Sequence, residues 1–174
     1  MAEESAAQRQ MSSSAGRIFG SMRFGAEHGV LPMAETLQGA MAARGVELCI
    51  INMAGGGDID RAVIDNIEAC DTFLVFGSAK YGEDTGNAAC TYYESKFAQD
   101  RKKRIILIRM IPFGEDFLEA QARFMFGLNM LVLPWMLGTP LPADLVDEII
   151  KAMELPTARP LTPASPASPL SPAH

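Results

Sequence analysis

The sequence predicts a single α/β domain in which helices cover both faces of a five-stranded parallel sheet. Five short runs are apolar along their whole length, which is typical of strands buried on both faces. Stretches with the period of an amphipathic helix separate these runs, so strands and helices alternate along the chain. Crossovers between parallel strands are right-handed. We therefore expect an open, doubly wound, flavodoxin-like sheet with the strand order 2-1-3-4-5.

The strand candidates are evenly spaced and lie at residues 17–22, 46–52, 72–77, 104–110 and 130–133. Helical periodicity predicts helices at residues 31–44, from residue 59 onward, and at residues 87–100, 116–126 and 143–154. Asp58 is a favourable N-cap for the second helix, and Gly45 is expected to end the first.

The two ends of the chain have a different composition from its middle. Residues 1–16 are small and polar, and residues 155–174 are rich in Pro, Ser and Ala, so neither end can form a packed core. We expect a disordered N-terminal arm over residues 1–16, the α/β domain over residues 17–154 and a disordered tail over residues 155–174.

Composition excludes several classes of function. The 174 residues include 15 Lys and Arg against 21 Asp and Glu, a net charge of −6 that disfavours nucleic-acid binding. Apolar runs are shorter than the roughly 18–20 residues of a membrane span, and the N-terminus lacks the apolar core of a signal peptide. We therefore expect a cytoplasmic protein with no nucleic-acid or membrane partner.

Histidine and cysteine are too scarce for the common metal and hydrolase sites. The two histidines are His28 and His174, and the three cysteines, Cys49, Cys70 and Cys90, show no C-x-x-C spacing. We expect no metal and no bound cofactor.

Ligands of doubly wound sheets bind beyond the carboxyl ends of the strands, so the loops there are the first candidates for a site. Neither G-x-G-x-x-G nor a P-loop follows the first strand. Gly55, Gly56 and Gly57 follow the second strand and could offer backbone N–H groups to a phosphate, or could serve only as a flexible turn.

The segment 78–97 carries a stronger signal. It holds all three tyrosines of the chain, at positions 81, 92 and 93, beside Glu94. A carboxylate flanked by aromatic rings can hydrogen-bond ribose hydroxyls while the rings stack on a base. The alternative interpretation is a solvated glutamate on a helix surface, next to tyrosines that pack in the core.

Three segments of the chain resemble Toll/interleukin-1 receptor (TIR) domains. IFGSMRFG at 18–25 resembles the first box of that family, DTFLVFGSAKYGEDTGNAACTYYE at 71–94 resembles its third strand and following helix, and LVLPW at 131–135 resembles its third box. Gly55–Gly57 with Asp58 occupies the position of the BB loop. The resemblance covers roughly residues 17–153 and implies the fold described above.

The resemblance implies one of two functions. Many TIR domains are signalling modules that assemble through the BB loop, and others cleave NAD⁺ to nicotinamide and ADP-ribose or a cyclic form. The second group implies Glu94 as the catalytic residue, NAD⁺ or a related nucleotide as substrate, and assembly-dependent activity with self-association through the 53–58 loop. The substrate-binding residues that we predict are Arg23, Phe24, Gly55, Gly56, Gly57, Ser78, Tyr81 and Tyr93.

One carboxylate is sufficient for NAD⁺ cleavage. The nicotinamide ring is already cationic, so it leaves as a neutral base without a general acid, and the carboxylate stabilises the oxocarbenium-like ribose. Two alternatives remain at this point. One is a non-enzymatic TIR-type signalling module. The other is an enzyme similar to nucleoside 2-deoxyribosyltransferases, which is suggested by Asp84, Thr85, Gly86 and Glu94. Such an enzyme would need Asp84 or Asp58 as an acid that protonates the leaving base.

Overall fold

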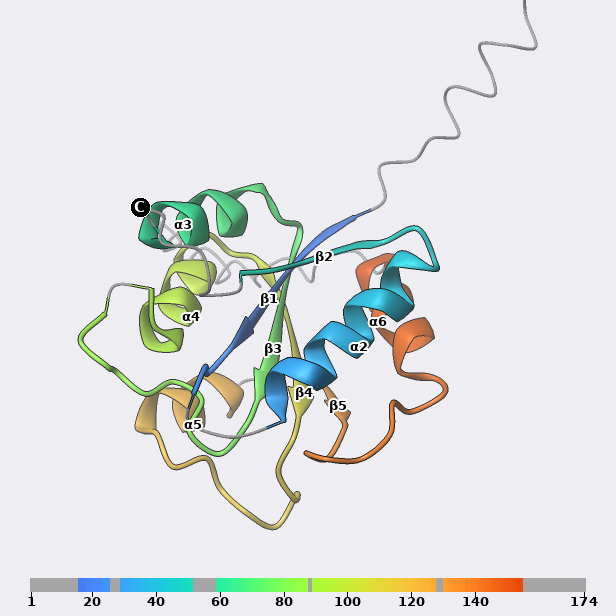
Figure 1. Cartoon of the computed structure of the whole chain (residues 1–174). Helices are drawn as coiled ribbons and strands as arrows, with labels where there is room; N and C mark the ends of the chain where they lie inside the picture. Colours follow the sequence, from blue (N-terminus) through green and yellow to red (C-terminus); the bar gives the residue numbers. More distant parts are fainter. Residues whose placement is uncertain (1–15, 26–28, 52–58, 88, 128–129, 155–174) are drawn as a thin grey trace, which may run out of the picture.

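The computed structural model describes residues 16–25, 29–51, 59–87, 89–127 and 130–154. Its centre is a five-stranded sheet in the order β2-β1-β3-β4-β5, and every neighbouring pair of strands is parallel (Figure 1). The predicted fold class and strand order are confirmed. The strands are β1 (Arg17–Met22), β2 (Glu47–Ile50), β3 (Thr72–Gly77), β4 (Arg104–Arg109) and β5 (Leu131–Pro134).

Helices cover both faces of this sheet. They are α2 (Val30–Ala42), α3 (Ile59–Ala69), α4 (Thr91–Asp100), α5 (Ala120–Phe126) and α6 (Leu145–Glu154). One apolar cluster joins the sheet to α2 and α6, and a second joins its other face to α3, α4 and α5. Figure 1 shows these two layers on opposite sides of the strands.

Strand β3 explains why an unbroken apolar run predicts a central strand. All six of its residues are buried. Leu74 and Phe76 belong to the cluster under α2 and α6, whereas Phe73 and Val75 belong to the cluster under α3, α4 and α5. Because successive side chains of a strand point to opposite faces, a strand covered by helices on both sides is apolar at most of its positions on both faces.

Three helices begin later than the sequence predicts, and α6 does so by two residues, at Leu145 rather than at residue 143. Helix α4 begins at Thr91 rather than at Asn87, because the Asn87 side chain accepts a hydrogen bond of 2.9 Å from the Ala89 N–H and closes a turn. Helix α5 begins at Ala120 rather than at residue 116. There the Arg123 guanidinium binds the carbonyls of Phe117 and Leu118, which lie before the helix.

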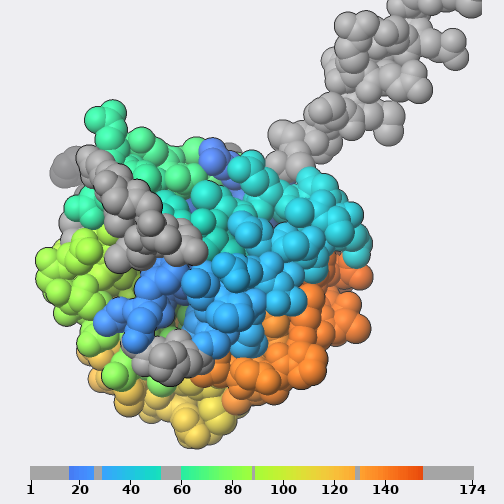
Figure 2. All heavy atoms as spheres, viewed as in Figure 1, coloured from blue at the N-terminus to red at the C-terminus, as the bar shows by residue number. Residues whose placement is uncertain are grey.

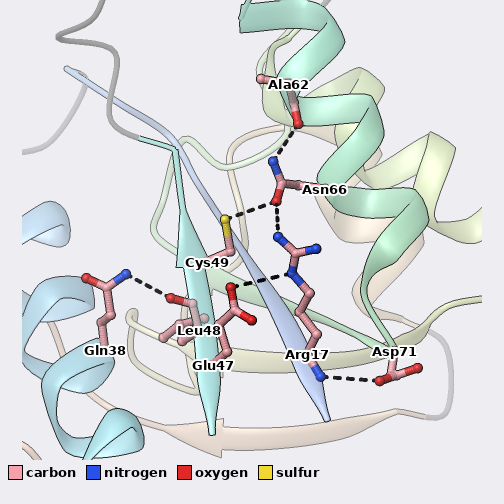
Figure 3. Close-up of polar contacts among 8 residues, drawn as sticks. All are labelled: Arg17, Gln38, Glu47, Leu48, Cys49, Ala62, Asn66 and Asp71. Atoms are coloured by element: carbon pink, nitrogen blue, oxygen red, sulfur yellow. Dashed lines mark hydrogen bonds and ion pairs between the residues drawn. The ribbon is translucent and has the colours of Figure 1, made fainter. Parts of the chain in front are cut away.

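Polar contacts at the amino end of β1 fix α3 and β2 against the sheet (Figure 3). The Arg17 guanidinium donates to Asn66 Oδ1 of α3 at 2.9 Å, and its Nε lies 3.6 Å from Glu47 Oε1 of β2. Cys49 of β2 donates to the same Asn66 oxygen at 3.2 Å. None of the helices in the described ranges is long and apolar enough to span a bilayer.

Candidate active site

A pocket of about 60 Å³ lies where the carboxyl ends of β1 and β2 meet helices α3 and α4. The chain passes from β1 to β2 on one side of it and then crosses back to β3 on its other side, so the direction of winding reverses at β1, and doubly wound folds bind ligands at such a point. In Figure 2 the end of β1 (blue) reaches the surface between α4 (yellow-green) and α2 (light blue). We call this the Glu94 pocket; it is lined by Phe19, Gly20, Met22, Arg23, Phe24, Ile51, Val63, Thr85, Asn87, Ala89, Cys90, Thr91 and Glu94.

Glu94 lies in the first turn of α4 and is buried, with only 7% of its surface exposed. Its Oε2 accepts a hydrogen bond of 2.5 Å from the hydroxyl of Ser21 in β1. The interpretation of Glu94 as a solvated surface residue is therefore wrong. A buried carboxylate beside a pocket is uncommon, because removing a charge from water is costly unless partners compensate.

Burial also controls the ionisation of this carboxyl group. It raises the pKa of Glu94 from its ordinary value of 4.5 to about 7, while the hydrogen bond from Ser21 acts in the opposite direction. A group with such a pKa exchanges its proton near neutral pH, which is the range that catalytic carboxyl groups use.

The hydrogen bonds continue from Ser21 to Tyr81. The Tyr81 hydroxyl lies 2.8 Å from Ser21 Oγ, and Tyr81 is fully buried. Burial and the neighbouring Glu94 carboxylate raise the pKa of Tyr81 well above its ordinary value, so the phenol keeps its proton. Tyr81, Ser21 and Glu94 thus form a buried chain of three polar side chains from three different segments.

Arg23 and Phe24, which directly follow β1, also line the pocket. The Arg23 guanidinium is held by Glu83: its Nε and Nη2 each lie 2.8 Å from Glu83 Oε2. Arg23 also donates to the carbonyl oxygen of Phe24. Glu83 belongs to the loop between β3 and α4, so this ion pair joins the two loops that border the pocket.

The β3–α4 loop is fixed in place by its own contacts. The Gly82 N–H donates to Thr91 Oγ1 at the start of α4 over 2.9 Å. Gly82 adopts a φ of 85°, which is in the left-handed region, and a side chain at this position would meet the backbone of Ala122 at 3.2 Å. Position 82 therefore requires a glycine, because the loop packs closely against α5 there. This close packing fixes the position of the next residue, Glu83.

The structure brings together three of the residues that the sequence predicts as functional, namely Glu94, Arg23 and Phe24. Tyr81 lies behind the pocket, in contact with Ser21. Ser78 is buried after β3, and its hydroxyl has no hydrogen-bond partner in the described ranges.

Tyr93 does not line the Glu94 pocket. It is 43% exposed and lines a second groove, of about 290 Å³, between α3 and α4, and Glu94 and Val63 line this groove as well. Gly55, Gly56 and Gly57, which we predicted to bind substrate, lie outside the described residues, as does the whole of the 53–58 loop.

Sequence reasoning missed two residues of this site, Ser21 and Glu83. A signal existed for Ser21, because it is a hydroxyl residue inside an otherwise apolar strand. Glu83 carries no such signal, since a glutamate in a loop is ordinary until its partner is known.

Within the described part of the chain, no group of three or more His, Cys, Asp or Glu side chains is placed to hold a metal ion.

Comparisons with known proteins give likenesses among solved structures and no family. No protein-family model matches the sequence, and no curated protein matches it. Among solved structures, a CMP N-glycosidase of Clostridium botulinum, BcmB, resembles this chain with a TM-score of 0.45 and 18% sequence identity, over 78% of this chain and 95% of that one. A similarity at this level does not assign a substrate or a reaction to this chain.

Proposed function

We propose that this chain hydrolyses the N-glycosidic bond of a nucleotide and that its substrate is NAD⁺. The observation that carries the proposal is Glu94, a buried carboxylate beside a pocket at the carboxyl edge of the sheet, held by a hydrogen bond from Ser21. The resemblance to TIR domains implies the same role for this glutamate.

The proposed reaction needs one negative charge near the ribose. The bond between the anomeric carbon and the nicotinamide nitrogen breaks, and its electron pair leaves with the ring as neutral nicotinamide. The ribosyl group becomes oxocarbenium-like, and the Glu94 carboxylate stabilises this developing positive charge. Addition of water then gives ADP-ribose and releases a proton; attack by the adenine ring instead of water would give the cyclic product.

The charges around the pocket favour a cationic substrate group. Among the described pocket residues together with Glu83, which pairs with Arg23, the charged side chains are Arg23, which is positive, and Glu83 and Glu94, which are negative when Glu94 is ionised. The Arg23 charge is neutralised by its contact with Glu83, so it does not repel a pyridinium ring. The remaining carboxylate attracts both the pyridinium and the ribosyl cation, and low local polarity strengthens this attraction.

A neutral nucleoside base fits this site less well. Such a base leaves readily only when an acid protonates it. Asp84, the acid suggested by the sequence, is exposed, and its carboxylate accepts a hydrogen bond of 2.9 Å from the Gly86 N–H. It does not line the Glu94 pocket. The second candidate, Asp58, lies outside the described residues.

The described walls enclose only part of a dinucleotide. Ligand pockets measure roughly 300–1,000 Å³, against about 60 Å³ here. The enclosed space suits the reacting part of the substrate near Glu94. The rest of the dinucleotide would contact the 53–58 loop, which connects Ile51 at the pocket wall to α3 and for which we also propose a role in self-association.

Release of nicotinamide from NAD⁺ by the purified protein tests the proposal. The assay compares the natural chain with Glu94→Ala at high protein concentration and with a crowding agent, while light scattering follows assembly. Release that disappears in Glu94→Ala supports the enzyme. Absence of release from an assembled natural chain would contradict it and favour a non-enzymatic TIR-type signalling module. Release that persists in Glu94→Ala would place the site elsewhere.

A further inference from the structure

We infer that Ser21 and Tyr81 are positioning residues that hold Oε2 of Glu94 and leave Oε1 as the carboxylate oxygen that meets the ligand. The nature of that ligand, a ribosyl group, rests on the proposed function. The positioning itself rests on the contacts within the chain.

Each member of this hydrogen-bond chain is fixed by a different segment. Ser21 is in β1, where its hydroxyl lies on the side of the sheet that α4 covers, and it is 1% exposed. Tyr81 belongs to the turn after β3, and its ring packs against Phe126 of α5 with 5.6 Å between ring centroids. Because all three side chains are buried and anchored, rotation of one of them would break a contact of another.

The direction of the hydrogen bonds follows from the number of hydrogens. An ionised carboxylate only accepts hydrogen bonds, so the single hydrogen of the Ser21 hydroxyl must point to Glu94. Tyr81 must then donate its hydrogen to Ser21 Oγ. The chain therefore runs from Tyr81 through Ser21 to Oε2, and every hydroxyl hydrogen in it has an acceptor.

The same arrangement determines where Glu94 accepts a proton. A proton on Oε2 would turn the Ser21 hydrogen toward Tyr81, and the fully buried Tyr81 hydroxyl would lose its acceptor. An unpaired buried donor is unfavourable, and the described residues offer Tyr81 no second acceptor. A proton on Oε1 leaves the chain intact. Oε1 is thus the oxygen that gains and loses the proton and that faces a ligand.

Other ionisable groups also face Glu94. Among the described residues these are Tyr81, in the turn after β3, and Arg23, directly after β1, while the α3 residues along the α3–α4 groove are apolar. The pocket and groove residues of its own helix region that can ionise are Cys90, Tyr93, Lys96 and Asp100. The substitutions of Ser21, Tyr81 and Ser95 described below do not alter these four residues. A change in the titration of Glu94 can therefore be assigned to the hydrogen-bond chain.

The test is a carboxyl-carbon NMR titration of Glu94, with Glu94→Gln used to assign its signal. We expect Ser21→Ala to move the midpoint upward by about one pH unit, because the ionised form loses its donor. Tyr81→Phe should move it upward by less, because Ser21 still donates. Ser95→Ala is the matched control: Ser95 is a fully buried serine of the same helix whose hydroxyl binds the Tyr92 carbonyl, and its loss should leave the midpoint unchanged.

An unchanged midpoint in folded Ser21→Ala overturns the inference. If that variant does not fold, Ser21→Cys keeps the size of the side chain with a weaker donor, and the same upward shift is expected. The titration is independent of turnover. A shifted midpoint in a chain that releases no nicotinamide therefore supports the positioning and contradicts the proposed function, while an unchanged midpoint in an active chain does the reverse.

In the active chain, a positioning role also predicts a specific kinetic pattern. Ser21→Ala should lower kcat at least tenfold with little change in KM, and the acidic limb of its pH profile should move upward together with the Glu94 midpoint. A loss of kcat with an unmoved pH profile would indicate a structural role only.

Discussion

Ser21 of β1 and Glu94 of α4 are 73 positions apart in the sequence, and their side chains are joined by a hydrogen bond of 2.5 Å in the interior. The contact connects the central part of the sheet to the first turn of the helix that borders the pocket. It places the charge of the buried Glu94 carboxylate beside the Glu94 pocket. The predictions below concern this charge and the residues that hold it.

The rate of nicotinamide release should rise with pH. Glu94 acts in its ionised form, and burial raises its pKa to about 7. Between pH 6 and pH 8 we expect roughly a tenfold increase in kcat, followed by a plateau. A pH–rate profile of the natural chain provides the measurement. A rate that is constant from pH 5 to pH 9, or highest at pH 5, would contradict the assignment.

Stability should change with pH in the opposite direction. The pKa of Glu94 is about 7 in the folded chain and about 4.5 in the unfolded one, so the folded state binds more protons between these values. The free energy of unfolding then falls as pH rises through this window, by on the order of 3 kcal/mol in total. Urea unfolding at pH 5 and pH 8 should show this loss in the natural chain and not in Glu94→Gln. An equal pH dependence in both would contradict the burial argument.

Glu83→Gln should weaken the binding of NAD⁺. Without the Glu83 carboxylate, the Arg23 guanidinium keeps its full charge beside the pocket and repels the pyridinium ring. We expect KM to rise several-fold with a smaller effect on kcat. Glu47→Gln is the matched control, because Glu47 pairs with Arg17 at the other end of β1. Equal KM values for the two variants would show that the Arg23–Glu83 pair does not influence the substrate.

Gly82→Ala should destabilise the chain more than Gly86→Ala. Both glycines have positive φ angles, 85° and 75°, so alanine adds backbone strain of about 1 kcal/mol at either position. An alanine at position 82 would also meet the Ala122 backbone at 3.2 Å, whereas nothing lies within 4 Å of position 86. We expect an additional loss of roughly 1–3 kcal/mol in the free energy of unfolding for Gly82→Ala. Equal losses in urea unfolding would contradict the close packing of this loop.

The fold could be predicted because its buried strands are recognisable in the sequence as short apolar runs. β1 and β3 have the predicted limits, since both lie inside the sheet and are apolar on both faces. The start of α4 could not be predicted in the same way. Asn87 opens a turn by binding the backbone with its side chain, and helical periodicity cannot distinguish such a turn from a first helical turn.

The site was predictable only in part. Glu94 was identified from its residue type, its tyrosine neighbours and the resemblance to TIR domains, yet its burial was not foreseen. The buried Glu94 carboxylate is held by Ser21, which is 73 residues away in the sequence. The Arg23 guanidinium is paired with Glu83, which is 60 residues away. Contacts between such distant residues arise from the tertiary structure, and local sequence patterns do not reveal them.

The rate of nicotinamide release by Glu94→Gln tests the central claim most directly. Glutamine keeps the shape of the side chain and can still accept a hydrogen bond from Ser21, but it carries no charge. The account predicts that Glu94→Gln binds NAD⁺ in calorimetry and releases nicotinamide at least about 100-fold more slowly than the natural chain. Release at the natural rate by this folded variant would contradict it, because the reaction would then not need the carboxylate.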